Sequence, residues 1–83
     1  MDSSTVNVRL FAAARAAAGV AEVAMTVGTV AELRERLGKD FGPELVRVLQ
    51  VSSVLVDGIS ASDDLVPLSE GATVDILPPF AGG

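Results

Sequence analysis

A single amphipathic helix with a clear start signal lies near the middle of this 83-residue chain. Residues 29–32, Thr-Val-Ala-Glu, have the form of a capping box, in which the hydroxyl and the carboxylate each accept a hydrogen bond from a backbone N–H at the helix start. Val30, Leu33 and Leu37 follow with the spacing of one apolar stripe, and Gly38 is predicted to end the helix. Such a helix must cover another layer, so the flanking segments are expected to form a sheet.

Alternating apolar and polar residues predict strands on both sides of this helix. Residues 5–11 and 22–27 alternate with the period of a strand that has one buried face, and as sequential strands they are expected to pair antiparallel. The alanine-rich segment 12–18 between them predicts a short helical turn that Gly19 caps. After the helix, residues 54–57 predict another short strand.

The second half of the chain is less regular. Residues 39–43 are expected to be a connection, and residues 44–50 predict either a second short helix or an extended segment, because their period is ambiguous. The Asp-Gly pair at 57–58 is a turn signal. Residues 73–77 predict a last, central strand, which ends at Pro78 because proline has no N–H to donate to a ladder.

The predicted order of elements is therefore strand, strand, helix, strand, strand. This is the order of a ubiquitin-like β-grasp, an α+β fold in which a mixed sheet of four to five strands carries one main helix across one face. A ferredoxin-like fold would need a second full helix before the last strand, which residues 44–50 offer only weakly. We predict a β-grasp domain over residues 1–77 and an extended tail over residues 78–83.

The residue types in the chain exclude most kinds of catalytic site. Cysteine and histidine are absent from the sequence, so it has no thiolate nucleophile, no zinc–thiolate site and no imidazole base. The adjacent Asp63 and Asp64 are typical of a solvated turn, and the acidic residues are too irregularly spaced for a calcium loop. We expect neither a cofactor nor a metal to bind this chain.

Charge and hydropathy narrow the class of partner. A formal net charge of −5, with Lys39 as the only lysine, argues against nucleic-acid binding and favours a basic protein surface as the partner. The N-terminus lacks the basic region of a secretory signal, and the apolar stretch 10–21 contains Arg15 and is too short to cross a bilayer. We expect a cytoplasmic protein without a membrane partner.

The last six residues, Pro-Pro-Phe-Ala-Gly-Gly, are typical of a segment that delivers a chain end into another protein's pocket. The two prolines favour a stiff, extended path, Phe80 supplies one apolar anchor, and Gly82 and Gly83 fit a slot too narrow for a side chain. A Gly-Gly end is also typical of a frayed terminus. The chemistry available is that of the terminal carboxylate.

A carboxylate is a poor electrophile until it is activated. Conversion of the Gly83 carboxylate to a mixed anhydride with AMP would make its carbonyl carbon open to attack, and attack by sulfide would yield a thiocarboxylate, a sulfur nucleophile that is ionised near neutral pH. No side chain of this sequence is suited to perform the activation, so the activating enzyme must be a separate protein.

Over nearly its whole length the chain resembles the small subunits of molybdopterin synthase, which belong to the MoaD/ThiS-like, ubiquitin-related sulfur-carrier family. The matching segments are residues 10–12 with Arg15 and Gly19, residues 29–33, 54–58 and 68–71, and above all the end 77–83, Leu-Pro-Pro-Phe-Ala-Gly-Gly. Two residues depart from the family pattern: Asp57 stands where members often have Asn, and Phe80 replaces a smaller aliphatic residue.

The resemblance implies a sulfur-donating subunit that is not an enzyme on its own. An E1-like adenylyltransferase, using ATP and magnesium, would adenylate Gly83, and a sulfurtransferase would convert it to the thiocarboxylate. The large subunit of molybdopterin synthase would supply the catalytic side chains, while Gly83 would supply sulfur for the molybdopterin dithiolene in molybdenum cofactor biosynthesis.

A docking surface for the partner is expected beside the tail. If the even-numbered residues of the last two strands face the helix, alternation places Leu55 and Leu77 on the opposite face of the sheet, and Phe11 has the parity to join them. The alternative is that Leu55 or Leu77 packs under the loops of residues 58–72. The predicted partner-binding residues are Phe11, Leu55, Leu77, Pro79, Phe80, Ala81 and Gly82.

The Gly-Gly end does not select one pathway. Carriers of sulfur for the thiamin thiazole, for cysteine and for tRNA thiolation share a similar end, and the chain length and the Leu-Phe-Ala start favour the molybdopterin branch. Two readings of another class stay open. In a ubiquitin-like protein modifier Gly83 would form an isopeptide bond with a lysine, and in a plain binding module the tail would have no role.

Overall fold

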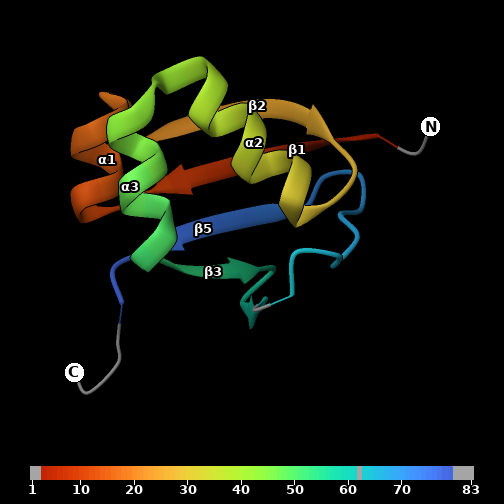
Figure 1. Ribbon diagram of the computed structural model, residues 1–83. Coiled ribbons are helices and arrows are strands. Elements are labelled where there is room, and N and C mark those ends of the chain that lie inside the picture. Colours follow the sequence, from red (N-terminus) through yellow and green to blue (C-terminus); the bar gives the residue numbers. More distant parts are fainter. Residues whose placement is uncertain (1–2, 62, 80–83) are drawn as a thin grey trace.

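The computed structural model describes residues 3–61 and 63–79, which form a sheet with helices packed on one of its faces (Figure 1). The predicted strands are present, and the bounds of the first and third differ from the prediction by one residue. The elements in chain order are β1 (Ser4–Leu10), α1 (Ala12–Ala18), β2 (Glu22–Val27), α2 (Val30–Phe41), α3 (Pro43–Val51), β3 (Ser53–Val56), β4 (Ile59–Ser60) and β5 (Thr73–Leu77).

The first and last strands form the centre of the sheet. Its five strands lie in the order β2-β1-β5-β3-β4. β1 pairs antiparallel with β2, as predicted, and β3 pairs antiparallel with both β4 and β5, whereas β1 and β5 run parallel. The predicted central position of the last strand is therefore confirmed, and the strand that leads to the C-terminal residues is held by a ladder on each side.

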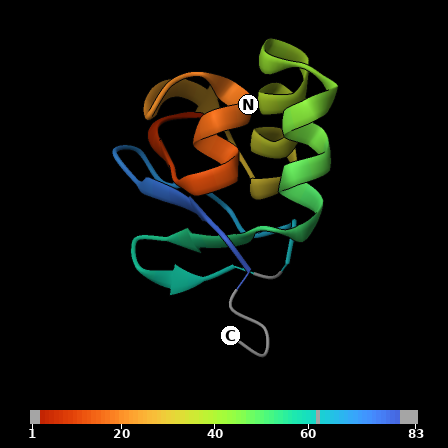
Figure 2. The ribbon, with the colours of Figure 1, turned by 90° about the vertical axis from the view of Figure 1, so that its left-hand side faces the viewer.

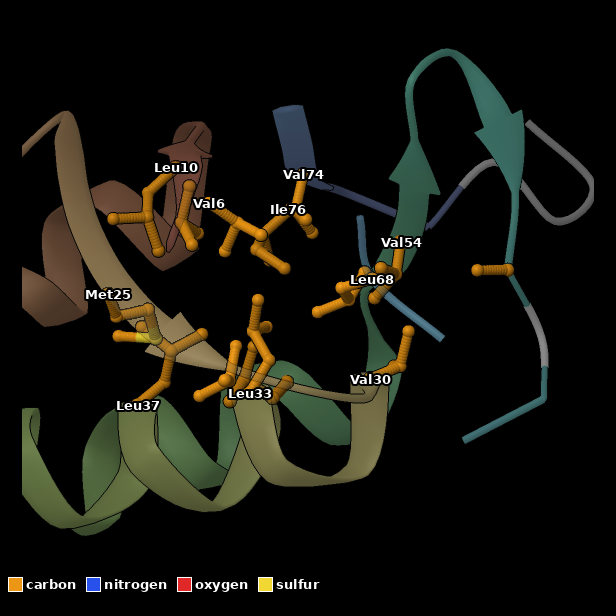
Figure 3. Packing of buried hydrophobic residues seen from close by; sticks show 14 of the residues in the cluster. Val6, Leu10, Met25, Val30, Leu33, Leu37, Val54, Leu68, Val74 and Ile76 are labelled. Atoms are coloured by element: carbon orange, nitrogen blue, oxygen red, sulfur yellow. The ribbon is translucent and has the colours of Figure 1, made fainter. Parts of the chain in front are cut away.

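The core lies between the sheet and α2 (Figure 3). The predicted apolar stripe of Val30, Leu33 and Leu37 is fully buried, and Figure 3 shows Leu33 and Leu37 directed toward the strands. Alternate residues of the strands form the other side of this core, because every second side chain of a strand points to the same face of the sheet. These buried strand residues are Val6, Val8, Leu10, Met25, Val27, Val54, Val74 and Ile76.

The start of α2 is capped as predicted, with one difference. The N–H of Glu32 donates to Oγ1 of Thr29 at 3.2 Å, but the Glu32 carboxylate accepts from the N–H of Gly28 at 2.6 Å and not from that of Thr29. The connection between β4 and β5 completes the cap, since the carbonyl of Val66 accepts from the N–H of Val30 at 3.1 Å. The helix start is thus tied to a segment far away in the sequence.

Gly38 does not end the helix, so that prediction is wrong. α2 continues to Phe41 and ends at Gly42, where φ is 100° and glycine avoids backbone strain. Gly38 has a different role, because a Cβ at this position would lie 2.6 Å from Cγ2 of Val46 on α3. Glycine inside α2 marks the close approach of a second helix, and Figure 2 shows α2 and α3 side by side.

The ambiguous segment 44–50 lies in a helix, α3. Pro43 occupies its first turn, where a missing N–H has no intrahelical partner to lose, and Leu45 and Leu49 are buried. The helical turn predicted for residues 12–18, with Gly19 as its cap, is α1. The described part of the chain thus has three helices, of which α2, predicted as the main helix, is the longest. None of the helices in this part is long and apolar enough to cross a membrane.

The turn predicted at residues 57–58 is confirmed. Asp57 and Gly58 have φ of 50° and 84°, and they join β3 to β4 as a two-residue hairpin loop. Positive φ at both positions is the conformation for which Asp-Gly is favoured. Oδ1 of Asp57 also accepts from the N–H of Thr73 at 2.9 Å, which fastens the turn to the start of β5.

Candidate functional site

The face of the sheet that the helices leave uncovered carries a band of side chains across its central strands. Arg9 on β1, Asp75 on β5 and Leu55 on β3 are paired in register, so their side chains point to the same face. Leu77, two residues after Asp75, and Phe11, two residues after Arg9, share this parity. We call this surface the open face and define it by Arg9, Phe11, Leu55, Asp75 and Leu77.

An ion pair lies at the centre of the open face. Nε and Nη2 of Arg9 donate to Oδ1 and Oδ2 of Asp75 at 2.6 and 2.9 Å. The side chain of Asp75 is 13% exposed and that of Arg9 is 44% exposed. The hydrogen bonds to Asp75, then its negative charge and that of Glu22, raise the pKa of Arg9 above its usual value, so the guanidinium stays charged. A bidentate ion pair of this kind fixes the position of the guanidinium on the open face.

Phe11 lies beside this ion pair. Its ring centroid is 5.7 Å from Cζ of Arg9, and its N–H donates to the carbonyl of Ile76 at 3.1 Å, which extends the β1–β5 ladder by one residue. The next residue, Ala12, has φ of 51°, a conformation that costs a residue with a Cβ about 1 kcal/mol. The chain therefore turns sharply after Phe11, whose side chain remains 38% exposed next to Arg9.

The open face leads into the C-terminal residues. Leu55 and Leu77 are half-buried, and Leu77 is followed directly by Pro78 and Pro79, which are exposed. The structure therefore brings Phe11, Leu55 and Leu77 onto the predicted face of the sheet, at the end from which the tail departs. Their role in partner binding stays a prediction. The other predicted residues, Phe80, Ala81, Gly82 and Gly83, lie outside the described residues.

Outside the open face, the described residues offer few groups that could bind a ligand or catalyse a reaction. A hollow of about 400 Å³ lies between α2 and α3, and another of about 330 Å³ lies beside the β3–β4 hairpin, both with mostly apolar walls. Asp63 accepts from the N–H of Leu65 at 2.8 Å, and Asp64 pairs with Arg34 at 3.0 Å, so the adjacent aspartates serve a turn and a tertiary contact. No group of three metal-ligating side chains occurs in this part of the chain.

Comparison with known proteins identifies the family. The profile described as "ThiS family" matches residues 8–83, which is nearly the whole chain and includes its last residue. The chain belongs to the ThiS family. The predicted membership of the ubiquitin-related sulfur-carrier group is thereby confirmed. A comparison with curated proteins found no match.

Solved structures share the fold of this ThiS-family chain. The small archaeal modifier protein 1 from Methanosarcina acetivorans has a TM-score of 0.84 at 25% identity, with 100% of both chains covered. The putative molybdopterin converting factor subunit 1 from Pyrococcus furiosus has a TM-score of 0.79 at 22% identity, with 94% of this chain and 100% of that one covered. A complex of subunits 1 and 2 of the molybdopterin-converting factor from Helicobacter pylori gives 0.73 at 24% identity, with 95% and 99% covered. The predicted ubiquitin-like β-grasp is confirmed.

The Arg9–Asp75 pair is the part of the site that the sequence analysis missed. Each residue stood on a separate predicted strand, 66 positions apart, with no local signal to connect them. The parallel pairing of the first and last strands of this ThiS-family chain is what places them side by side. Opposite charges of matching parity on these two strands were the available signal, and it is readable only once the strand order is known.

Proposed function

We propose that this protein is the sulfur-carrier small subunit of molybdopterin synthase and that the C-terminal carboxylate of Gly83 carries the sulfur. The observation that carries the proposal is the family match, which runs through the Gly-Gly end up to residue 83. The position of β5 at the centre of the sheet also supports the proposal. A strand that is hydrogen-bonded on both sides holds the starting point of residues 78–83 in a fixed place, and these residues must enter another protein.

The proposed chemistry takes place at one carbon atom. The Gly83 carboxylate attacks the α-phosphorus of ATP in an E1-like adenylyltransferase, with magnesium on the phosphates, and pyrophosphate leaves. Sulfide then attacks the carbonyl carbon, and AMP leaves with the electron pair of the broken C–O bond. If a sulfurtransferase delivers the sulfur as a persulfide, attack by its outer sulfur expels AMP and gives an acyl disulfide. A thiol then attacks the sulfur bound to the sulfurtransferase, forms a disulfide with it and releases the thiocarboxylate. The product is the thiocarboxylate, and the contribution of this chain is to present it without side-chain bulk.

The proposed acceptor is a pyranopterin precursor held by the large subunit of the synthase. That subunit supplies the catalytic side chains and takes the tail into its active site, while the open face of this chain docks on its surface. The Helicobacter pylori neighbour, a complex of subunits 1 and 2 of the molybdopterin-converting factor, supports a second subunit as the partner. Neither the pterin nor a metal is proposed to bind this chain alone.

A second candidate function is protein modification. The Methanosarcina acetivorans neighbour is a small archaeal modifier protein with the same fold over the whole of both chains. In this function the activated carbonyl of Gly83 would be attacked by a lysine amine and not by sulfur, and the product would be an isopeptide. Sulfur carriage for thiazole, cysteine or tRNA differs from the main proposal only in the acceptor.

Mass spectrometry of the protein recovered from its own cells distinguishes these functions. The proposal expects a terminal mass increase equal to the exchange of one oxygen for sulfur, whereas a modifier would be found as branched conjugates on lysines. Absence of both forms, with full activity after deletion of Gly82 and Gly83, would overturn both.

A variant with one extra residue after Gly83 tests the role of the end itself. We expect this variant to unfold like the wild type and to fail in restoring molybdoenzyme activity to a strain that lacks the small subunit. The matched control carries one extra residue at the N-terminus and should restore activity in full, because β1 runs parallel to β5 and so begins at the opposite end of the sheet from the end of β5. Full activity of the C-terminally extended protein, with the extra residue still present, contradicts the proposal.

A further inference from the structure

The ion pair on the open face is a poor way to stabilise this fold. Pairs in which one partner reaches solvent contribute little to stability, and withdrawing a carboxylate from water carries a desolvation cost. Asp75 is nevertheless the one buried charged or polar residue among residues 3–61 and 63–79, and it lies in the middle of the sheet. Leucine at both positions would avoid that cost, and the leucine at position 75 would lie next to Leu55. This makes a role in recognition the better physical account of the pair.

The guanidinium of Arg9 is held in one orientation. Asp75 occupies Nε and Nη2, and the ring of Phe11 lies 5.7 Å from Cζ. Neither hydrogen bond uses Nη1, which keeps two N–H donors outside the pair. Because the side chain of Arg9 is 44% exposed, water can reach the guanidinium in the free protein. Docking of a partner on the open face would remove that water.

The charges around Arg9 indicate what kind of group can replace the water. Asp75 already neutralises the guanidinium, and Glu22, in register with Arg9 on β2, adds a further negative charge nearby. A second carboxylate would approach two like charges, so a neutral acceptor fits better. The neutral acceptor that every protein surface can offer is a backbone carbonyl oxygen.

We propose that Arg9 is a specificity-determining residue of the open face, and that it donates from Nη1 to a backbone carbonyl oxygen of the partner protein. The partner surface places apolar side chains against Phe11, Leu55 and Leu77, and one main-chain carbonyl at their centre. Asp75 is the positioning residue that holds the guanidinium for this bond. The inference rests on the proposed function, since the partner is the large subunit of molybdopterin synthase.

The test compares two double variants of the full-length protein by titration calorimetry with the large subunit from the same organism. Arg9→Met with Asp75→Leu replaces the ion pair by apolar side chains of similar volume. The matched control, Arg36→Met with Asp40→Leu, removes an exposed ion pair on α2, on the other side of the sheet. Thermal unfolding followed by circular dichroism shows that both variants are folded. Arg9→Lys with Asp75 retained serves as a second variant if the first does not fold.

We expect the open-face variant to bind about tenfold more weakly or worse, which is the range for loss of a charge-assisted hydrogen bond, and the control to bind like the wild type. The dependence of affinity on salt should be the same in the wild type and the open-face variant, because a carbonyl carries no net charge. Equal or tighter binding by the open-face variant overturns the role of Arg9. A weaker salt dependence in that variant overturns the carbonyl in favour of a carboxylate. Failure of the wild type to bind the large subunit overturns the proposed function and, with it, the partner named here.

Discussion

Adding one methyl group at Gly38 tests the packing of α2 against α3. Gly38→Ala would place a Cβ 2.6 Å from Cγ2 of Val46, whereas two carbon atoms prefer a separation of about 3.5–4.0 Å. The overlap is therefore on the order of 1 Å. Either α3 moves away from α2, or the Val46 side chain leaves its rotamer, which is stiff because valine is β-branched.

The expected magnitude follows from two opposing terms. Overpacking of this kind lowers the free energy of unfolding by about 1–3 kcal/mol, whereas replacing glycine by alanine inside a helix raises it by about 1 kcal/mol. Val46 is 40% exposed, so part of the overlap can relax toward solvent, and we expect Gly38→Ala to lower the free energy of unfolding by about 1 kcal/mol. In a Val46→Ala background the overlap is removed, and the same substitution should raise the free energy of unfolding by about 1 kcal/mol.

The assay is a double-mutant cycle measured by urea unfolding, with helix content followed by circular dichroism. The expected coupling between the two positions is about 2 kcal/mol, which is well above the scatter of about 0.3–0.5 kcal/mol found for independent sites. Val51→Ala, at an exposed valine at the end of α3, is the control and should show no coupling with Gly38→Ala. If Gly38→Ala alone stabilises the protein by about 1 kcal/mol, as it would in an isolated exposed helix, the packing argument is refuted.

Two further predictions concern the open face and the hairpin. Leu55→Asp should leave the unfolding curve nearly unchanged and weaken binding to the large subunit, measured by titration, by about tenfold or more. The control Leu65→Asp, at a leucine that is 77% exposed on the β4–β5 connection, should bind normally. Equal affinities for both variants would remove Leu55 from the interface. Asp57→Asn should change the free energy of unfolding by less than about 0.5 kcal/mol, because asparagine also tolerates the positive φ of this turn. Asp57→Ala should destabilise by about 1–2 kcal/mol, since it keeps the strain and loses the hydrogen bond to the Thr73 N–H, and a neutral effect in urea unfolding would show that neither matters.

Local patterns predicted the elements that depend on local physics. The capping signal at residues 29–32 and the stripe of Val30, Leu33 and Leu37 located α2, because a helix start and an amphipathic face are properties of a few neighbouring residues. The Asp-Gly pair at 57–58 located the hairpin for the same reason, since its backbone angles suit few other residues. Alternation placed Leu55 and Leu77 on one face of the sheet, as period two requires.

Patterns along one segment failed where the cause lies on another segment. Glycine is a common helix end, so the local pattern predicts that the helix stops at Gly38, but the small size of this residue serves the contact with Val46 on α3. The segment 44–50 has no clear period by itself and is helical in the fold, where Leu45 and Leu49 are buried against the rest of the core. Tertiary packing decided both cases.

The sequence by itself located the main amphipathic helix over a sheet, and it shows the absence of cysteine and histidine and the Gly-Gly end, because these follow from residue types and short-range spacing. That the terminal carboxylate is the reactive group stays a prediction. Only the tertiary structure decided that the first and last strands lie side by side and bring Arg9 against Asp75. Strand order is set by how the whole chain buries its apolar area, and no short stretch of residues contains that information.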